Sequence, residues 1–186
     1  MAARTVYYAA MSLDGYIAEP EERLGWLTGF EGSGSAIGEG NPIADSYPAF
    51  FEGVGSLAMG SKTYEFLLRE DAWTYGDMPT WVYTSRELDR FEQAGGLCFA
   101  SGDVAADHAE QIEAAGGKDL WVVGGGDLAS QYVAAGLLDL VRITVVPVIL
   151  GSGLPLFAEP LPKALRLLGS TPFANGMIEL SYEVAR

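Results

Sequence analysis

The sequence is poor in the side chains that most often bind metals or form nucleophile–base pairs. It has one cysteine, Cys98, and one histidine, His108, in 186 residues. A single cysteine excludes an internal disulfide, and we expect Cys98 to be a small buried apolar side chain, not a reactive thiol. Zinc sites recruit several histidine or cysteine ligands, and a Ser-His-acid triad would depend on His108 alone. We therefore expect no metal site and no triad hydrolase.

Positive charge is also scarce. The chain has 11 basic and 25 acidic residues, which gives a formal net charge of −14. Nucleic acids and anionic membrane surfaces bind clustered positive charge, so we expect neither as a partner. An anionic cofactor would have to be held by local backbone donors and one or two well-placed cations, because the long-range field repels it.

Long apolar runs are missing as well. The longest uncharged stretch, residues 143–158, is broken by two prolines and two glycines, so it does not predict a membrane span. The apolar run after Arg4 ends at Asp14, too early for the core of a secretory signal. We expect a cytoplasmic protein.

Two common glycine signatures do not occur where they would be informative. The chain has no Gly-x-Ser-x-Gly nucleophile elbow, and no Gly-x-Gly-x-x-Gly follows its first apolar segment. Their absence disfavours an ordinary hydrolase and an ordinary dinucleotide-binding fold.

The chain does contain an alternation of short strands and helices. Apolar segments followed by turn residues predict strands at residues 5–13, 56–60, 81–84, 97–100, 120–123 and 141–149. Helices are expected at residues 42–53 and after the candidate capping residues Ser61, Asp103 and Asp127. The glycine-rich segment 28–45 is equally compatible with a surface loop and with a lid over a site.

The end of the chain has a different pattern. Asn175-Gly176 is a strong hairpin signal. After it, apolar side chains at 178, 180, 182 and 184 alternate with Glu179, Ser181 and Glu183, as in a strand with one buried face. The sequence therefore predicts one α/β domain over residues 1–186, with three α/β/α layers, a mostly parallel mixed sheet and a C-terminal antiparallel hairpin.

Three strand-to-helix junctions carry residues suited to binding a ligand. Ligands of open α/β sheets bind beyond the carboxyl ends of the strands, where helix N-termini present backbone amides. The junctions are Gly60-Ser61-Lys62-Thr63, Thr84-Ser85-Arg86 and Gly124-Gly125-Gly126-Asp127. Each alone is also a common packing device, but their recurrence along one sheet edge favours a nucleotide site.

Four ordered motifs resemble a known family. Met59-Gly60-Ser61-Lys62-Thr63-Tyr64-Glu65 and Val122-Val123-Gly124-Gly125-Gly126 resemble glycine segments of dihydrofolate reductases. Segments 12–18 and 147–157 are more similar to the C-terminal reductase domain of the bifunctional riboflavin-biosynthesis deaminase-reductase. The chain is thus identified as a stand-alone member of that branch, with a dihydrofolate reductase-like fold.

The resemblance implies hydride transfer from NADPH to a C=N bond of a pterin-like or pyrimidine-like molecule. It implies that the nicotinamide lies beside Ala10 and Ile17 and that Trp26 lies near the mouth of the site. It also assigns residues to the cofactor's phosphates and to its nicotinamide side, namely Gly60, Ser61, Lys62, Thr63, Thr84, Ser85, Arg86, Gly124, Gly125, Gly126, Asp127 and Leu128. Homodimers formed through the sheet edge and C-terminal strands are typical of this branch.

The sequence departs from the family at the cofactor site. Ser61 occupies the position where the family usually has an arginine that contacts the 2′-phosphate. Arg86, and with it Lys62, would then have to distinguish NADPH from NADH. We expect a weakened preference for NADPH, with NADH also accepted.

Reduction of a C=N bond requires a proton donor for the nitrogen. Asp45 lies at the position, relative to Gly60, of the carboxylate that anchors the pterin in dihydrofolate reductases, so it is a candidate for catalysis and substrate binding. Asp14, after the first strand, is the rival. Each could instead be a surface or turn residue.

A non-catalytic nucleotide- or pterin-binding protein and a flavin or pterin carrier remain alternatives to a reductase.

Overall fold

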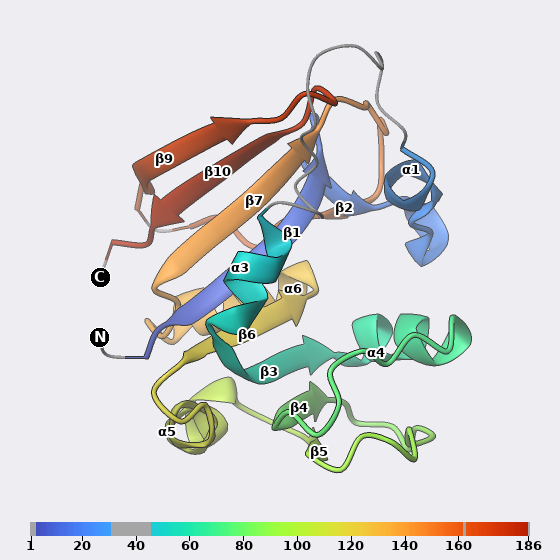
Figure 1. The fold of residues 1–186 in the computed structure, drawn as a ribbon, viewed down its shortest axis with the longest axis vertical. Coiled ribbons are helices and arrows are strands. Elements are labelled where there is room, and N and C mark those ends of the chain that lie inside the picture. Colours follow the sequence, from blue (N-terminus) through green and yellow to red (C-terminus); the bar gives the residue numbers. More distant parts are fainter. Residues whose placement is uncertain (1–2, 31–45, 162, 186) are drawn as a thin grey trace.

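The chain forms a twisted sheet with helices on both faces (Figure 1). The computed structural model describes residues 3–30, 46–161 and 163–185. The elements in chain order are β1 Thr5–Ser12, β2 Tyr16–Ala18, a 3₁₀ turn Pro20–Glu22, α1 Gly25–Thr28, α3 Tyr47–Glu52, β3 Val54–Gly60, α4 Ser61–Arg69, β4 Thr80–Tyr83, β5 Leu97–Ala100, α5 Val104–Ala114, β6 Asp119–Gly124, α6 Gly126–Ala134, β7 Leu140–Val146, β8 Leu154–Pro155, β9 Arg166–Pro172 and β10 Ile178–Glu183.

The main sheet has eight strands in the order β5-β4-β3-β6-β1-β7-β10-β9. The first six are parallel, and β10 and β9 form the antiparallel hairpin at one edge. A two-stranded ribbon of β2 and β8 lies apart from this sheet. This arrangement is the dihydrofolate reductase-like fold that the sequence predicts, as the comparison with solved structures below also shows.

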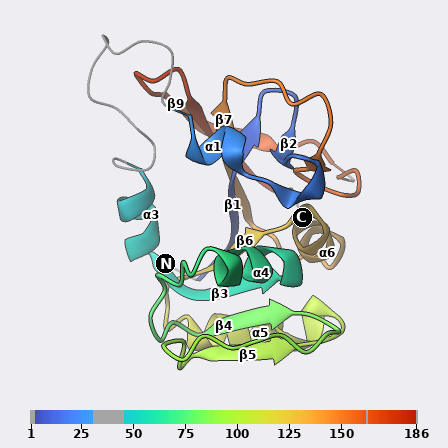
Figure 2. The ribbon, with the colours of Figure 1, turned by 90° about the vertical axis from the view of Figure 1, so that its right-hand side faces the viewer.

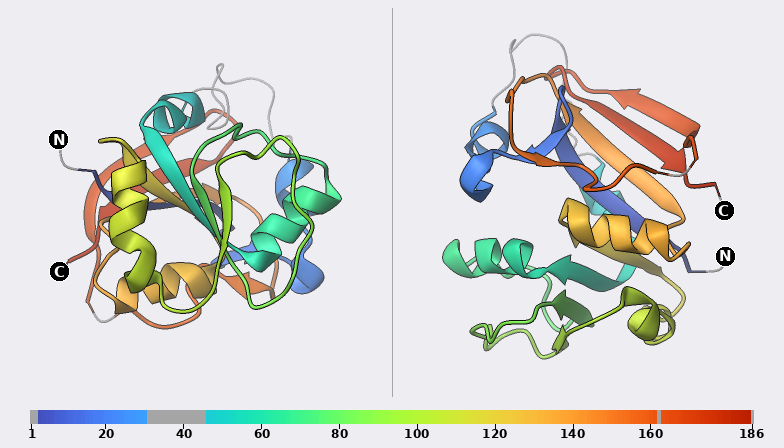
Figure 3. Two further views of the ribbon diagram at one scale, coloured as in Figure 1. Left: turned by 90° about the horizontal axis from the view of Figure 1, so that it is seen from below. Right: turned by 180° about the vertical axis from the view of Figure 1, so that it is seen from behind.

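Two apolar cores separate the layers. One core packs Phe50 of α3 and Tyr64 of α4 against Tyr8 and Trp121 of the sheet. The other packs α5 and α6 against the opposite face, where Tyr7 is fully buried. Because consecutive side chains of a strand point to opposite faces, Tyr7 and Tyr8 each anchor one core. Figure 3 shows α3 and α6 on opposite sides of the sheet.

The helix starts correct two of the sequence predictions. Asp103 caps α5 as expected, because its side chain accepts a hydrogen bond from the amide of Ala105 at 2.9 Å. Ser61 and Asp127, however, lie inside the first turns of α4 and α6, and the caps are Gly60 and Gly125. Neither glycine has a side chain to bond the first amides, so these helix ends are left open to another acceptor.

Other boundaries differ modestly. The predicted strand 141–149 ends at Val146, since Pro147 cannot donate to the sheet. The predicted helix 42–53 is observed as α3 from Tyr47, and residues 41–45 lie outside the described part of the chain. The alternation in β10 implies an exposed Glu179, but this residue is only 5% exposed, and Ser46, directly before α3, and Arg142 of β7 supply its hydrogen-bond partners.

Candidate functional site

The three predicted junctions lie at the carboxyl edge of the parallel strands. Strand β3 lies between β4 and β6, and its last residues pair with both, Gly60 with Tyr83 and Met59 with Gly124. In Figure 2, which looks towards this edge, α4 lies below α1 and β2. The fold therefore brings together segments that are more than sixty residues apart in the sequence.

The glycine junction is tightly built on one side and open on the other. A Cβ at Gly124 would come within 3.0 Å of the hydroxyl of Thr63, and a Cβ at Gly60 within 3.8 Å of the Gly124 carbonyl. At Gly125 the nearest atom to such a Cβ is Cδ1 of Ile17, at 4.0 Å. The main chain of Gly125 is therefore open, with the side chain of Ile17 beside it.

The N-terminus of α6 completes this surface. Gly126 must be glycine, because a Cβ there would collide with the carbonyl of Pro155. Asp127 is exposed in the first turn, whereas Leu128 is 3% exposed and packs in the core. A contact between Leu128 and a cofactor could therefore involve only its backbone. Amides at this helix end favour an anion, and the Asp127 carboxylate opposes one.

Both cations expected to bind the cofactor's phosphate are paired with carboxylates. Arg86 donates to the two oxygens of Glu65 at 2.9 and 2.7 Å, and to the Ser61 hydroxyl at 3.1 Å. The pKa of Arg86 is raised by Glu65. Lys62 lies 2.6 Å from Glu22. A phosphate at this site would have to compete with these carboxylates.

The remaining residues of the second junction mainly shape the turn. The Thr84 hydroxyl accepts a hydrogen bond from the Arg86 amide at 3.0 Å and donates to the Arg86 carbonyl at 3.2 Å. Ser85 is exposed beside it. Thr84 thus orients Arg86, and only Ser85 and Arg86 point side chains outwards.

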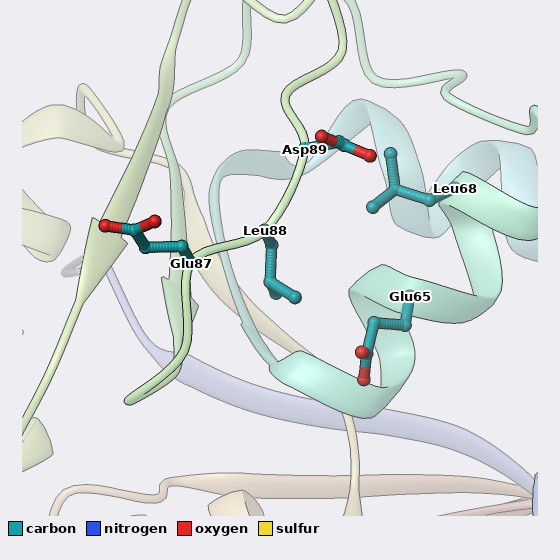
Figure 4. A pocket seen from close by; sticks show the side chains of 5 residues that line it. All are labelled: Glu65, Leu68, Glu87, Leu88 and Asp89. Carbon is teal, nitrogen blue, oxygen red and sulfur yellow. The ribbon is translucent and has the colours of Figure 1, made fainter.

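A hollow of about 580 Å³ lies beside α4, lined by Glu65, Leu68, Glu87, Leu88 and Asp89. Figure 4 shows the three carboxylates of this lining, of which that of Glu87 points away from the other four side chains. Their negative charge repels phosphate groups, so this hollow is unsuited to the anionic part of a nucleotide.

Asp14 is tied into the turn after β1. Its carboxylate accepts hydrogen bonds from the Ser12 hydroxyl at 2.7 Å and from the amides of Leu150 and Gly151 at 3.1 and 2.7 Å. These bonds, that from Ser12 first, lower the pKa of Asp14. A proton donor near neutral pH requires the opposite shift, so the geometry favours a turn residue.

The other two residues expected at the substrate side are only partly placed. The indole Nε1 of Trp26, in α1, is buried and finds no acceptor among the described residues. It is a donor available to a ligand or a water molecule. Asp45 lies outside the described residues, directly before Ser46. Ala10 lies on β1, opposite Thr144 of β7.

Sequence reasoning missed a buried polar cluster made by Tyr8, Ser46, Arg142 and Glu179. Glu179 pairs with Arg142 at 2.7 Å and accepts hydrogen bonds from Tyr8 and Ser46. A signal was present, since Arg142 is the only charged residue within the apolar segment 141–149. A charge in such a strand requires a partner, and the adjacent β10 offers Glu179.

The lone histidine and cysteine lie in packing positions. His108 Nε2 is 2.8 Å from the Thr5 hydroxyl, and its ring lies against Tyr132. Cys98 is half-buried, and burial raises the pKa of its thiol. Within the described residues, no group of three or more His, Cys, Asp or Glu side chains is placed to hold a metal. No helix in that part of the chain is long and apolar enough to cross a membrane.

Comparison with known proteins then decides the family. The model of the RibD C-terminal domain matches residues 59–178, more than half of the chain. The chain belongs to this family. A curated relative, the uncharacterized protein YwjB of Bacillus subtilis, is 31% identical over 98% of both chains.

Solved structures agree with a RibD-type fold. A putative riboflavin biosynthesis protein from Shewanella sp. PV-4 is 26% identical, with a TM-score of 0.79 over 98% of this chain and 99% of that one. A pyrimidine reductase-like protein from Corynebacterium diphtheriae is 16% identical, with a TM-score of 0.66 over 99% and 92%. Dihydrofolate reductase from Enterococcus faecalis, complexed with NADP(H), is 14% identical, with a TM-score of 0.66 over 98% and 97%.

Proposed function

We propose that this RibD-type protein is a nicotinamide-dependent reductase that transfers a hydride to a C=N bond of a pterin-like or pyrimidine-like small molecule. The observation that carries the proposal is the convergence of Ile17, Thr63 and the open main chain of Gly125 at the carboxyl edge. The family and the fold are those of reductases, which supports the same reaction class.

The proposed cofactor lies along this edge. Its nicotinamide is placed beside Ala10 and Ile17, where glycine lets the ring approach the chain. Its pyrophosphate is placed at the open N-terminus of α6, where the amides after Gly125 have no side-chain cap. The bound group would supply the hydride. The protein's own part is to orient the ring and exclude water from its reactive face.

Cofactor preference follows from the ion pairs. Ser61 provides no charge, and Arg86 is held in a two-pronged pair by Glu65. The 2′-phosphate of NADPH would be attracted by the guanidinium of Arg86 and repelled by the carboxylate of Glu65. NADH, with a neutral 2′-hydroxyl there, is not repelled, so we propose that both cofactors are accepted.

The proton donor remains a sequence-based proposal. The lowered pKa of Asp14 argues against this residue as the proton donor, which leaves Asp45 as the candidate. We expect Asp45→Asn to lower turnover strongly while NADPH affinity stays unchanged, because the donor acts on the substrate. Unchanged turnover would exclude Asp45.

The test of the proposed function is a titration with NADPH and NADH that follows quenching of tryptophan fluorescence. Micromolar binding of either nucleotide supports the cofactor site, and oxidation in the presence of pterins or aminopyrimidinones supports the reductase. Binding without oxidation by any candidate substrate would favour a non-catalytic nucleotide-binding protein instead. A folded protein that binds neither nucleotide would contradict the proposal.

A further inference from the structure

The buried cluster around Glu179 is a complete hydrogen-bonding unit. Oε1 of Glu179 accepts a hydrogen bond from Nε of Arg142 at 2.8 Å, and Nη2 of Arg142 lies 2.7 Å from the same oxygen and donates to the Ser46 hydroxyl at 2.6 Å. Oε2 accepts from the Tyr8 hydroxyl at 3.1 Å and from the Ser46 hydroxyl at 2.8 Å. Each carboxylate oxygen of Glu179 thus has two polar partners within the cluster.

The fold alone does not explain this unit. An ion pair buried between two strands is often no more stabilising than apolar side chains of the same volume. The surroundings of the cluster are apolar, since the Arg142 guanidinium lies 5.3 Å from the centre of the Tyr8 ring and 5.5 Å from that of Phe50. A charged pair at this place calls for a reason other than stability.

The position of the guanidinium supplies that reason. In the sheet register Arg142 is opposite Tyr8, while Glu179 is opposite Thr144, which in turn is opposite Ala10. Because Glu179 is level with Thr144, two residues further along β7, the side chain of Arg142 reaches diagonally towards the carboxyl edge to meet it. Two residues of a strand span about 7 Å, the size of one heteroaromatic ring. Arg142 is thus within a ring's length of Ala10, the proposed border of the nicotinamide.

Arg142 also keeps donors for a ligand. Its Nη1 carries two N–H groups, for which the described residues provide no acceptor. The side chain is 27% exposed, against 6% for Glu179. Because Glu179 neutralises the guanidinium, the pair suits a neutral acceptor such as a carbonyl better than a phosphate. The buried rings of Tyr8 and Phe50 pack against the guanidinium and hold it in place from the core side.

We propose that Arg142 is a specificity-determining residue that donates to an exocyclic carbonyl oxygen of a neutral, flat heteroaromatic substrate, with Glu179 as the positioning residue that aims it. The inference rests on the proposed reductase function, because the position of the substrate follows from that of the nicotinamide. Neither Arg142 nor Glu179 is among the residues assigned to the cofactor.

The test compares two probes that differ in hydrogen-bonding pattern. 6-Aminouracil presents carbonyl acceptors, and 2,4,6-triaminopyrimidine presents amino donors at the same ring positions. Calorimetric titration of the NADPH-loaded protein is expected to show tighter binding of 6-aminouracil. In Arg142→Met this affinity falls about 10- to 100-fold, the range for a hydrogen bond from a charged donor, and the preference between the probes is lost.

Two controls separate this result from misfolding and from failure of the reductase proposal. Arg166→Met removes another Arg–Glu pair of β10, that with Glu183, outside the site, and should leave both affinities unchanged. NADPH affinity should be the same in all variants. Binding of NADPH without any binding of 6-aminouracil by the wild type overturns the inference and leaves the cofactor site intact. Equal 6-aminouracil affinity in Arg142→Met also overturns it.

If Arg142→Met does not fold, the variant Glu179→Gln provides an independent test of the role of Arg142. Glu179→Gln preserves the shape of the cluster but leaves the Arg142 charge uncompensated. We expect orotate, a uracil bearing a carboxylate, to bind about 10-fold more tightly relative to 6-aminouracil than in the wild type. An unchanged ratio of the two affinities would show that Arg142 does not face the ligand.

Discussion

Most charged side chains around the proposed site are held by a neighbour of opposite sign. Arg86 pairs with Glu65, Lys62 with Glu22, and Arg142 with Glu179. The first two pairs are partly exposed and contribute little to stability. Their importance lies in binding, since an incoming phosphate has to displace a carboxylate before it can use the cation.

The Glu65–Arg86 pair gives a direct test of cofactor preference. In Glu65→Gln the guanidinium loses its carboxylate, so Arg86 becomes available to the 2′-phosphate. We expect NADPH to bind about 10-fold more tightly and NADH to be unaffected. The measurement is the ratio of the two dissociation constants. Glu70→Gln, which breaks the pair with Arg69 on the same helix, is the matched control; an unchanged ratio in Glu65→Gln would mean that Arg86 does not contact the cofactor.

The lowered pKa of Asp14 implies a specific dependence of the protein's stability on pH. Because its pKa is lowered from 3.8 in the folded protein, its contribution is fully present above that value and is lost as the pH falls through the folded-state pKa. We therefore expect Asp14→Asn to have a lower thermal midpoint than the wild type at neutral pH, and the difference to shrink in acid. Turnover should persist if the residue only shapes the turn.

The control for Asp14 is Glu113→Gln, since Glu113 is exposed on α5. This variant should follow the wild type at every pH. A large loss of turnover in Asp14→Asn, with the fold intact, would return Asp14 to the role of proton donor.

At the scale of elements, one buried amide ties α5 and α6 to the sheet. Gln111 of α5 is fully buried. It accepts a hydrogen bond from the Tyr132 hydroxyl at 2.7 Å and donates to the Tyr83 hydroxyl at 2.8 Å. Burial raises the pKa of both tyrosines, so they remain neutral donors. A single side chain thus links two helices and β4.

Removing this link should be costly. Gln111→Ala leaves a cavity and takes one hydrogen-bond partner from the buried Tyr132 and one from the partly buried Tyr83, so we expect it to lower the free energy of unfolding by about 3 kcal/mol. Urea denaturation of the variant and of Gln131→Ala, an exposed glutamine of α6, measures the difference. Equal midpoints for the two variants would contradict the role given to Gln111.

The elements also show what the sequence could predict. Parallel strands buried on both faces are apolar throughout, so β1, β3 and β6 were found within two residues of their ends. The caps of α4 and α6 were misplaced because a polar residue beside a glycine was taken as the cap. The charge of Arg142 within an apolar segment indicated that it needs a partner, but the choice of Glu179 could not be predicted, since it depends on the register of β7 and β10.

At the scale of the whole molecule, the β9 edge of the sheet is unusually open. Every residue of β9 is exposed, and Leu167 and Leu168 are 54% and 48% exposed. Open strand edges with apolar side chains pair with other chains. We propose a homodimer formed through this edge, as expected from the family resemblance.

Light scattering after size-exclusion chromatography tests the dimer. The wild type should have twice the mass of the 19.8 kDa chain, and Leu168→Lys should have the mass of one chain. Leu13→Lys is the control, because Leu13 is as exposed (61%) but lies after β1, away from this edge. A wild-type protein with the mass of one chain would exclude the proposed dimer.

The place of β1 in the sheet has a consequence for the order in which the chain is made. Thr5 pairs with Leu120, and Tyr8 with Arg142, so β1 is synthesised before its partner strands, which lie more than a hundred residues later in the chain. Until β6 and β7 have left the ribosome, Tyr7 and Tyr8 of β1 lack the neighbouring strands between which they are buried in the folded protein. Such distant pairing slows folding. The nascent chain therefore carries β1 without its partner strands while more than a hundred further residues are added, and we expect the yield of folded protein to depend on how well that interval is shielded from aggregation.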